Sequence, residues 1–156
     1  MRRPITKKHK IVPDHKYNSE KISKFINYIM LDGERNVAKE IVYKAFDKIA
    51  KDTGTKDPME VFEDALKNVE PNMEVRSRRI GGANYQVPRP VNAVRRRLLS
   101  MNWIIGAARA KKGKPMHVRL ADELILASKG EGEAVKKREN THRMADANKA
   151  FAHFSW

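Results

Sequence analysis

Apolar side chains recur at helical spacing along most of this chain, and this periodicity constrains the fold more than any other feature. Within residues 22–30 the apolar positions fall at i, i+3, i+4, i+7 and i+8, which places them on one face of a helix. The same spacing returns in residues 38–49, 61–69, 91–108 and 116–125. A last helix is expected over about residues 133–150, at the surface, because it carries few large apolar side chains. The pattern predicts a mainly α protein, a bundle of about six helices around one core.

One helix start is marked with particular clarity. Asp57 is a capping residue, Pro58 occupies the first helical position, and Glu60 follows three residues after the cap. Pro71 ends the helix that begins there.

Residues 73–89 break the helical period and are predicted to form a two-stranded antiparallel ribbon. Gly81-Gly82 permits the positive φ values of a tight hairpin turn. Side chains alternate between the faces of a strand, so Arg76 and Arg78 share one face while Arg79 lies on the other. Neither face is apolar, and an isolated hairpin is marginally stable in water. We therefore expect a ribbon that protrudes from the helical body and is stabilised by something outside that body.

The length of 156 residues fits a single domain, residues 1–156. Residues 1–18 lack periodicity and are predicted to be an extended basic arm, and residues 150–156 form a C-terminal segment. The chain has no cysteine, so disulfides and thiolate chemistry are excluded and a reducing cytoplasmic setting suits it.

Charge points to the class of partner. The chain has 33 Lys and Arg residues against 19 Asp and Glu residues, a net charge of +14. The excess is concentrated in residues 1–18, 72–97 and 109–119, which together carry only two acidic side chains. Such islands indicate a polyanionic partner, and nucleic acid is the first candidate.

These islands supply candidate contact residues. Guanidinium groups bind phosphate in a bidentate manner, and a tyrosine can stack on a base. The candidates are Arg76, Arg78, Arg79 and Tyr85 in the ribbon, Arg95, Arg96 and Arg97 at the next helix start, Lys111, Lys112, Lys114 and Arg119 in and after the later loop, and Lys136, Lys137 and Arg138 in the last helix. Alternatives remain open: a solvated hairpin whose arginines pair within the protein, a disordered tail, a solvated loop, and a last helix neutralised by its own glutamates.

No catalytic or metal-binding pattern accompanies the basic islands. The histidines lack ligand spacing, and phosphate-binding and nucleophile motifs are absent. The neighbours Glu63-Asp64 and Asp122-Glu123 lie on predicted helices and point in different directions. We therefore expect no enzyme activity, metal or cofactor. No apolar run approaches 18 residues and the N-terminus lacks a signal-peptide core, so no membrane partner is expected.

Three stretches carry a resemblance to a known family. NSEKISKFINYIMLDGERNVAKEIVYKAFD, EVRSRRIGGANYQVP and AVKKRENTHRMADANKAFAHFSW, in this order, resemble the bacterial form of the small-subunit ribosomal protein seven family. The resemblance covers essentially the whole chain. It implies a body of six helices with a protruding β-ribbon, and a location in the cytoplasm, within the ribosome.

The resemblance also implies a function. Family members bind the 3′ major domain of the small-subunit ribosomal RNA directly and early, and help to nucleate assembly of the subunit head. They lie beside the transfer RNA exit site and the messenger RNA exit channel, next to protein eleven and other head proteins. By position, the implied RNA-binding residues are Arg2, Arg3, Lys7, Lys8 and Lys10 in the arm, Arg76, Arg78 and Arg79 in the ribbon, Arg95, Arg96 and Arg97 beside it, and Lys136, Lys137, Arg138 and Arg143 in the last helix.

Two other functions compete with this interpretation. A DNA-bending architectural protein could insert the ribbon into a groove, but the ribbon tip has no large apolar wedge. An RNA-processing enzyme would need a carboxylate or nucleophile cluster, which the sequence does not offer.

Overall fold

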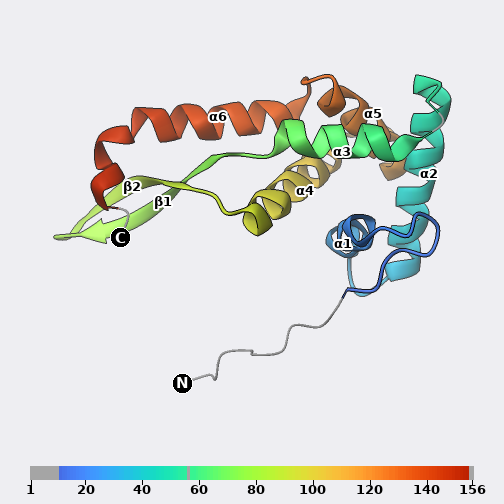
Figure 1. The fold of residues 1–156 in the computed structure, drawn as a ribbon, viewed down its shortest axis with the longest axis horizontal. Coiled ribbons are helices and arrows are strands. Elements are labelled where there is room, and N and C mark those ends of the chain that lie inside the picture. Colours follow the sequence, from blue (N-terminus) through green and yellow to red (C-terminus); the bar gives the residue numbers. More distant parts are fainter. Residues whose placement is uncertain (1–10, 56, 155–156) are drawn as a thin grey trace. The chain divides into compact units, whose positions relative to one another are not determined.

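The computed structural model describes residues 11–55 and 57–154. The elements follow the chain as α1 (Glu20–Ile29), α2 (Arg35–Thr53), α3 (Pro58–Val69), β1 (Met73–Ile80), β2 (Ala83–Pro90), α4 (Ala93–Ala110), α5 (Met116–Ser128), α6 (Glu133–Ala147) and the 3-10 helix η1 (Lys149–Phe154) (Figure 1). The predicted fold class, mainly helical with one two-stranded ribbon, is confirmed.

The chain divides into two compact units, Met1–Glu40 and Ile41–Trp156, and the boundary falls within α2. In the first unit, α1 buries the predicted apolar stripe of Ile22, Phe25, Ile26 and Ile29.

At the described end of the predicted extended arm, residues 15–17 form a turn. The Asp14 carboxylate accepts hydrogen bonds from the backbone N–H groups of Lys16 (3.1 Å) and Tyr17 (3.3 Å). An aspartate that bonds the backbone two and three residues ahead favours a local turn over extended chain. The basic residues before residue 11 lie outside the described part of the chain.

The second unit has a helical core built from the predicted stripes. Asp57 accepts the backbone N–H of Met59 (2.8 Å) and Pro58 occupies the first turn, so α3 begins where the sequence predicts. Phe62 of α3 packs against Phe46, with the ring centroids 5.5 Å apart. Helices α3 and α4 both pack against α5, and the core contains Phe46, Ile49, Phe62, Ala65, Leu66, Met101, Ile104, Ile105, Leu120 and Leu124.

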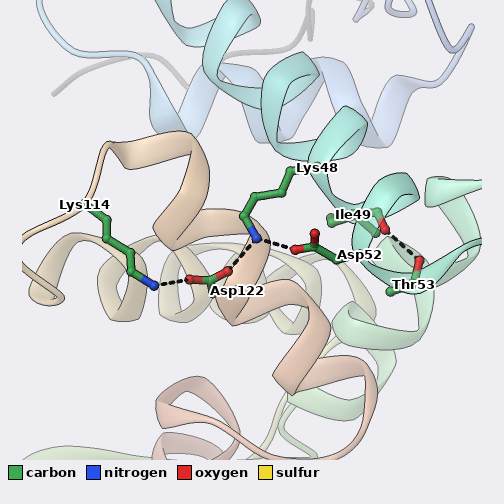
Figure 2. Close-up of polar contacts among 6 residues, drawn as sticks. All are labelled: Lys48, Ile49, Asp52, Thr53, Lys114 and Asp122. Carbon is green, nitrogen blue, oxygen red and sulfur yellow. Dashed lines mark hydrogen bonds and ion pairs between the residues drawn. The ribbon is translucent and has the colours of Figure 1, made fainter.

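A polar bridge links α2 to α5 within the second unit. The Lys48 ammonium group donates to Asp52 in its own helix α2 and to Asp122 of α5, the latter at 3.0 Å. Lys114 approaches Asp122 from the other side (Figure 2). Partial burial acts to raise the pKa of Asp122, but the hydrogen bonds and charges of Lys48 and Lys114 outweigh it and hold that pKa below its ordinary value. The bridge therefore favours an ionised Asp122.

The ribbon turns at Gly81-Gly82, as predicted. Ile80 pairs with Ala83 across Gly81 (φ +57°) and Gly82 (φ +94°), and Glu74 pairs with Arg89 near the base. Contacts within the same unit stabilise this base: α6 runs alongside β1, and η1 packs on β2 (Figure 1). Val87 and Pro88 are buried there. Stabilisation from outside the body is therefore not required for the base of the ribbon, because the chain's own C-terminal region covers it.

Among the described residues, no helix combines the length and the apolar character that crossing a membrane requires.

Candidate nucleic-acid interface

A buried carboxylate organises the base of the ribbon. The Glu74 side chain is only 8% exposed, and its Oε1 accepts from Nε of Arg89 (2.8 Å) while Oε2 accepts from Nε of Arg95 (2.6 Å). Arg76 Nε lies 3.4 Å from Oε1. Burial acts to raise the pKa of Glu74, but the hydrogen bonds and charges of Arg95 and Arg89 hold it below its ordinary value. One carboxylate thus fixes three guanidinium groups and leaves a net positive cluster.

Further along the ribbon, the C-terminal segment engages two predicted contact residues. Arg78 Nη1 donates to the Phe154 carbonyl (2.9 Å). The ring of Tyr85 packs against those of Phe151 and Phe154, with centroids 5.2 and 5.4 Å apart. Two rings of the C-terminal segment thus half-bury Tyr85, and base stacking by Tyr85 stays a prediction. Arg79, on the opposite face, is exposed.

The three arginines that open α4 differ in their surroundings. The Asn92 side chain caps the helix by accepting the backbone N–H of Arg95 (2.8 Å). Arg95 is bound to Glu74, Arg96 donates to the Val91 carbonyl (3.4 Å), and Arg97 is exposed. This part of α4 adds positive charge directly beside the ribbon base.

In the later loop, internal contacts hold several of the basic side chains. Lys111 Nζ lies 2.6 Å from Oε2 of the fully buried Glu123, and Arg119 donates to the backbone carbonyls of Arg109 and Lys111. Lys112 is exposed, and Lys114 pairs with Asp122 at 3.5 Å while its side chain stays 64% exposed. Lys111 and Arg119 thus stabilise the loop, and Lys112 and Lys114 face solvent.

On α6 the basic residues also divide into paired and exposed groups. Lys136 pairs with Glu133 (2.8 Å), as the helical spacing suggested, and Arg138 donates to the Asn68 carbonyl. Lys137 and Arg143 are exposed. Arg96, Arg138 and Arg143 line a cleft of about 580 Å³ formed by α3, α4 and α6.

Five predicted contact residues in the arm lie outside the described part of the chain: Arg2, Arg3, Lys7, Lys8 and Lys10. In the part that is described, no group of three or more His, Asp or Glu residues could hold a metal ion.

The sequence model of the family described as ribosomal protein S7p/S5e matches residues 1–149. The chain belongs to this family. Relatives described as small ribosomal subunit protein uS7 agree along their whole lengths. The Francisella tularensis protein is 54% identical over 155 residues, covering 99% of each chain, and the Pseudothermotoga lettingae protein is 51% identical over 156 residues, covering 100% of each. The Magnetococcus marinus protein is 51% identical over 155 residues, covering 99% of each.

Family membership gives the general role of the protein. The chain is a structural, non-enzymatic component of the cytoplasmic small ribosomal subunit, and RNA binding is general in the family. The predicted resemblance is confirmed.

Sequence reasoning missed Glu74, Arg89 and Phe154 as parts of this surface. The two-residue Gly81-Gly82 turn fixes the register, so counting outward from it pairs Glu74 with Arg89, and this signal was present in the sequence. No local pattern brings Phe154 to the ribbon, because that contact depends on the direction in which α6 leaves the core.

Proposed function

We propose that this protein binds the 3′ major domain of the small-subunit ribosomal RNA directly and early, and so nucleates assembly of the subunit head. In this proposal it lies beside the transfer RNA exit site and the messenger RNA exit channel. Its neighbours are protein eleven and other head proteins, with exit-site transfer RNA and nearby messenger RNA as passing partners.

The observation that carries the proposal is the way in which the ribbon presents its arginines. The buried Glu74 orients Arg76, Arg89 and Arg95, so these guanidinium groups lose little side-chain freedom when they bind phosphate. Neutralising phosphates where RNA helices converge releases counterions and stabilises the junction.

The proposed RNA-binding residues fall into two groups. Exposed side chains are proposed as direct phosphate contacts: Arg76, Arg79, Arg97, Lys112, Lys114, Lys136, Lys137 and Arg143. Half-buried side chains contact RNA with the donors that their internal partners leave unused: Arg78, Tyr85, Arg95, Arg96, Lys111, Arg119 and Arg138. Arg2, Arg3, Lys7, Lys8 and Lys10 are proposed as contacts of the arm.

The experiment compares affinities for two nucleic acids in the absence of other ribosomal proteins. The full chain is titrated against a junction fragment of the 3′ major domain and against duplex DNA of equal charge, at matched salt. We expect tight, salt-dependent binding to the RNA and at least about 1,000-fold weaker binding to the DNA, as for specific against non-specific complexes. Equal affinity for the two would contradict a specific ribosomal RNA contact.

A further inference from the structure

The geometry points to a binding site for one nucleotide of single-stranded RNA, in a groove between the ribbon and the C-terminal segment. The groove has a volume of about 550 Å³ and is lined by Arg76, Arg78, Arg89, Val87, Pro90 and Phe154. This volume falls within the range of about 300–1,000 Å³ that is typical of small-ligand sites. This site rests on the proposed function. It adds to that function which face of the ribbon binds RNA, that the bound unit is a single nucleotide, and which residues contact it.

The first part of the site is a phosphate-binding wall. Glu74 Oε1 lies 2.8 Å from Nε and 2.7 Å from Nη2 of Arg89, and 3.4 Å from Nε of Arg76. Each guanidinium group has five N–H donors, so both arginines keep donors for a phosphate. Arg76 is 52% exposed and Arg89 is 36% exposed, whereas Glu74 is 8% exposed. The negative charge therefore lies behind the arginines, and Arg76, Arg78, Arg89 and Arg95 together with Glu74 carry a net charge of +3.

The second part of the site is an apolar wall that suits a base. Phe154 lines the groove together with Val87 and Pro90. Its position is fixed twice, because its carbonyl accepts from Arg78 (2.9 Å) and its ring packs on Tyr85 (5.4 Å between centroids). Aromatic rings beside guanidinium groups are the usual chemistry of single-stranded RNA recognition. An acidic peptide would use the arginines but would gain little from Phe154.

The third observation is that the three arginines and Val87 share one face of the ribbon, whereas the lining residues Ser77 and Pro90 occupy positions of the other face. Arg76 and Arg78 alternate with Arg79 along β1, and their cross-strand partners are Val87 and Tyr85. Arg79 pairs with Asn84 on the opposite face. The ribbon is therefore two-sided, with the nucleotide site on the face that the C-terminal segment covers.

The test measures binding of a labelled single-stranded oligouridylate to the full chain by fluorescence anisotropy over a range of salt concentrations. The paired variant Arg76→Ala with Arg89→Ala should reduce the magnitude of the salt slope by about 1.4, from two lost phosphate contacts of about 0.7 each. Lys129→Ala should leave that slope unchanged, because Lys129 is exposed at the C-cap of α5 and does not line the groove. Phe154→Ala should weaken binding roughly 5- to 150-fold without changing the slope, because base stacking contributes about 1–3 kcal/mol.

Phe154→Leu is the matched variant for the aromatic wall, because Phe151 also stacks with Phe154, with the ring centroids 6.4 Å apart, and so belongs to the same cluster. Leucine keeps an apolar side chain but offers no aromatic face to a base. Phe154→Leu should therefore weaken binding about as much as Phe154→Ala. Circular dichroism of every variant checks that the fold is retained.

Two results would overturn the nucleotide site. One is unaltered binding by Phe154→Leu, which would make the Phe154 ring a packing group without a stacking role. The other is competition by polyglutamate as effective as that by unlabelled oligouridylate, which would indicate an acidic protein partner. The same variants are also titrated with the 3′ major domain fragment. If the unaltered chain binds that fragment and the groove variants bind it equally well, the inference fails while the proposed function stands. If the unaltered chain does not bind the fragment, the proposed function fails.

Discussion

Gly132, at the start of α6, is held in a conformation that other residues adopt only under strain. Its backbone has φ +99° and ψ 172°, a region used almost only by glycine. A Cβ atom there would lie 2.9 Å from Oε1 of Glu123 and 3.3 Å from Cβ of Leu126. That same Glu123 oxygen accepts the backbone N–H of Ala134 (3.0 Å), so the glycine lets a buried carboxylate from α5 cap α6.

Replacing Gly132 with alanine should lower the free energy of unfolding by about 1–3 kcal/mol, through backbone strain and the clash with Glu123. Gly106→Ala is the matched control, because Gly106 lies inside α4 and a Cβ there meets nothing within 4 Å. That substitution should raise the stability by about 0.5–1 kcal/mol. Urea denaturation measures both values, and equal effects of the two substitutions would contradict the structure around Gly132.

Glu74 should make the stability of the protein sensitive to acid. Its pKa is lowered in the folded state, so it contributes stability above its ordinary pKa of about 4.5, and this contribution is lost as the pH falls through the lower folded value. Glu74→Gln should therefore destabilise the protein at neutral pH and flatten the loss of stability below about pH 4.5. Denaturation midpoints over a pH series measure this, with the exposed Glu131→Gln as control. Parallel pH profiles for Glu74→Gln and the unaltered chain would rule out the proposed role of Glu74.

At the scale of elements, η1 and the ribbon form one packing unit. The segment joins the ribbon through Arg78, Tyr85, Phe151 and Phe154, and α6 covers β1. A two-stranded hairpin is marginal alone, so these contacts decide how well the ribbon keeps its shape without RNA.

A chain ending at Asn148 should expose the ribbon to trypsin. Cleavage after Arg76, Arg78 and Arg79 should become faster, because local opening of the strands no longer breaks contacts with η1. Cleavage after the exposed loop residue Lys112 serves as the internal reference and should not change. Mass spectrometry of the early fragments distinguishes the sites, and unchanged ribbon cleavage would show that η1 does not stabilise it.

The elements differ in how far their sequences determine them. The start of α3 follows from Asp57 and Pro58 alone, since the cap and the fixed φ of proline act within a few residues. The adjacent Asp122 and Glu123 do point in different directions, as expected for a helix. Their partners, Lys48 and Lys111, could not be predicted, because those contacts arise only when α2, the loop and α5 pack together.

Across the described part of the molecule, the charge islands 72–97 and 109–119 are mixtures of bound and exposed groups. Residues 72–97 contain one acidic side chain, yet Glu74 contacts Arg76, Arg89 and Arg95. Composition therefore predicted the class of partner but not the number of side chains available to it. That number depends on which side chains are buried and on the strand register, and the composition of the islands determines neither.

The most direct test of the central claim is the salt dependence of binding to the ribosomal RNA fragment. The unaltered chain is compared with a variant in which Arg76, Arg78 and Arg79 are all alanine. Each lost phosphate contact should reduce the magnitude of the slope of log K against log salt by about 0.7–0.9, giving a total reduction of about two to three. An unchanged slope would contradict the account, because it would mean that the ribbon arginines pair within the protein and leave RNA untouched.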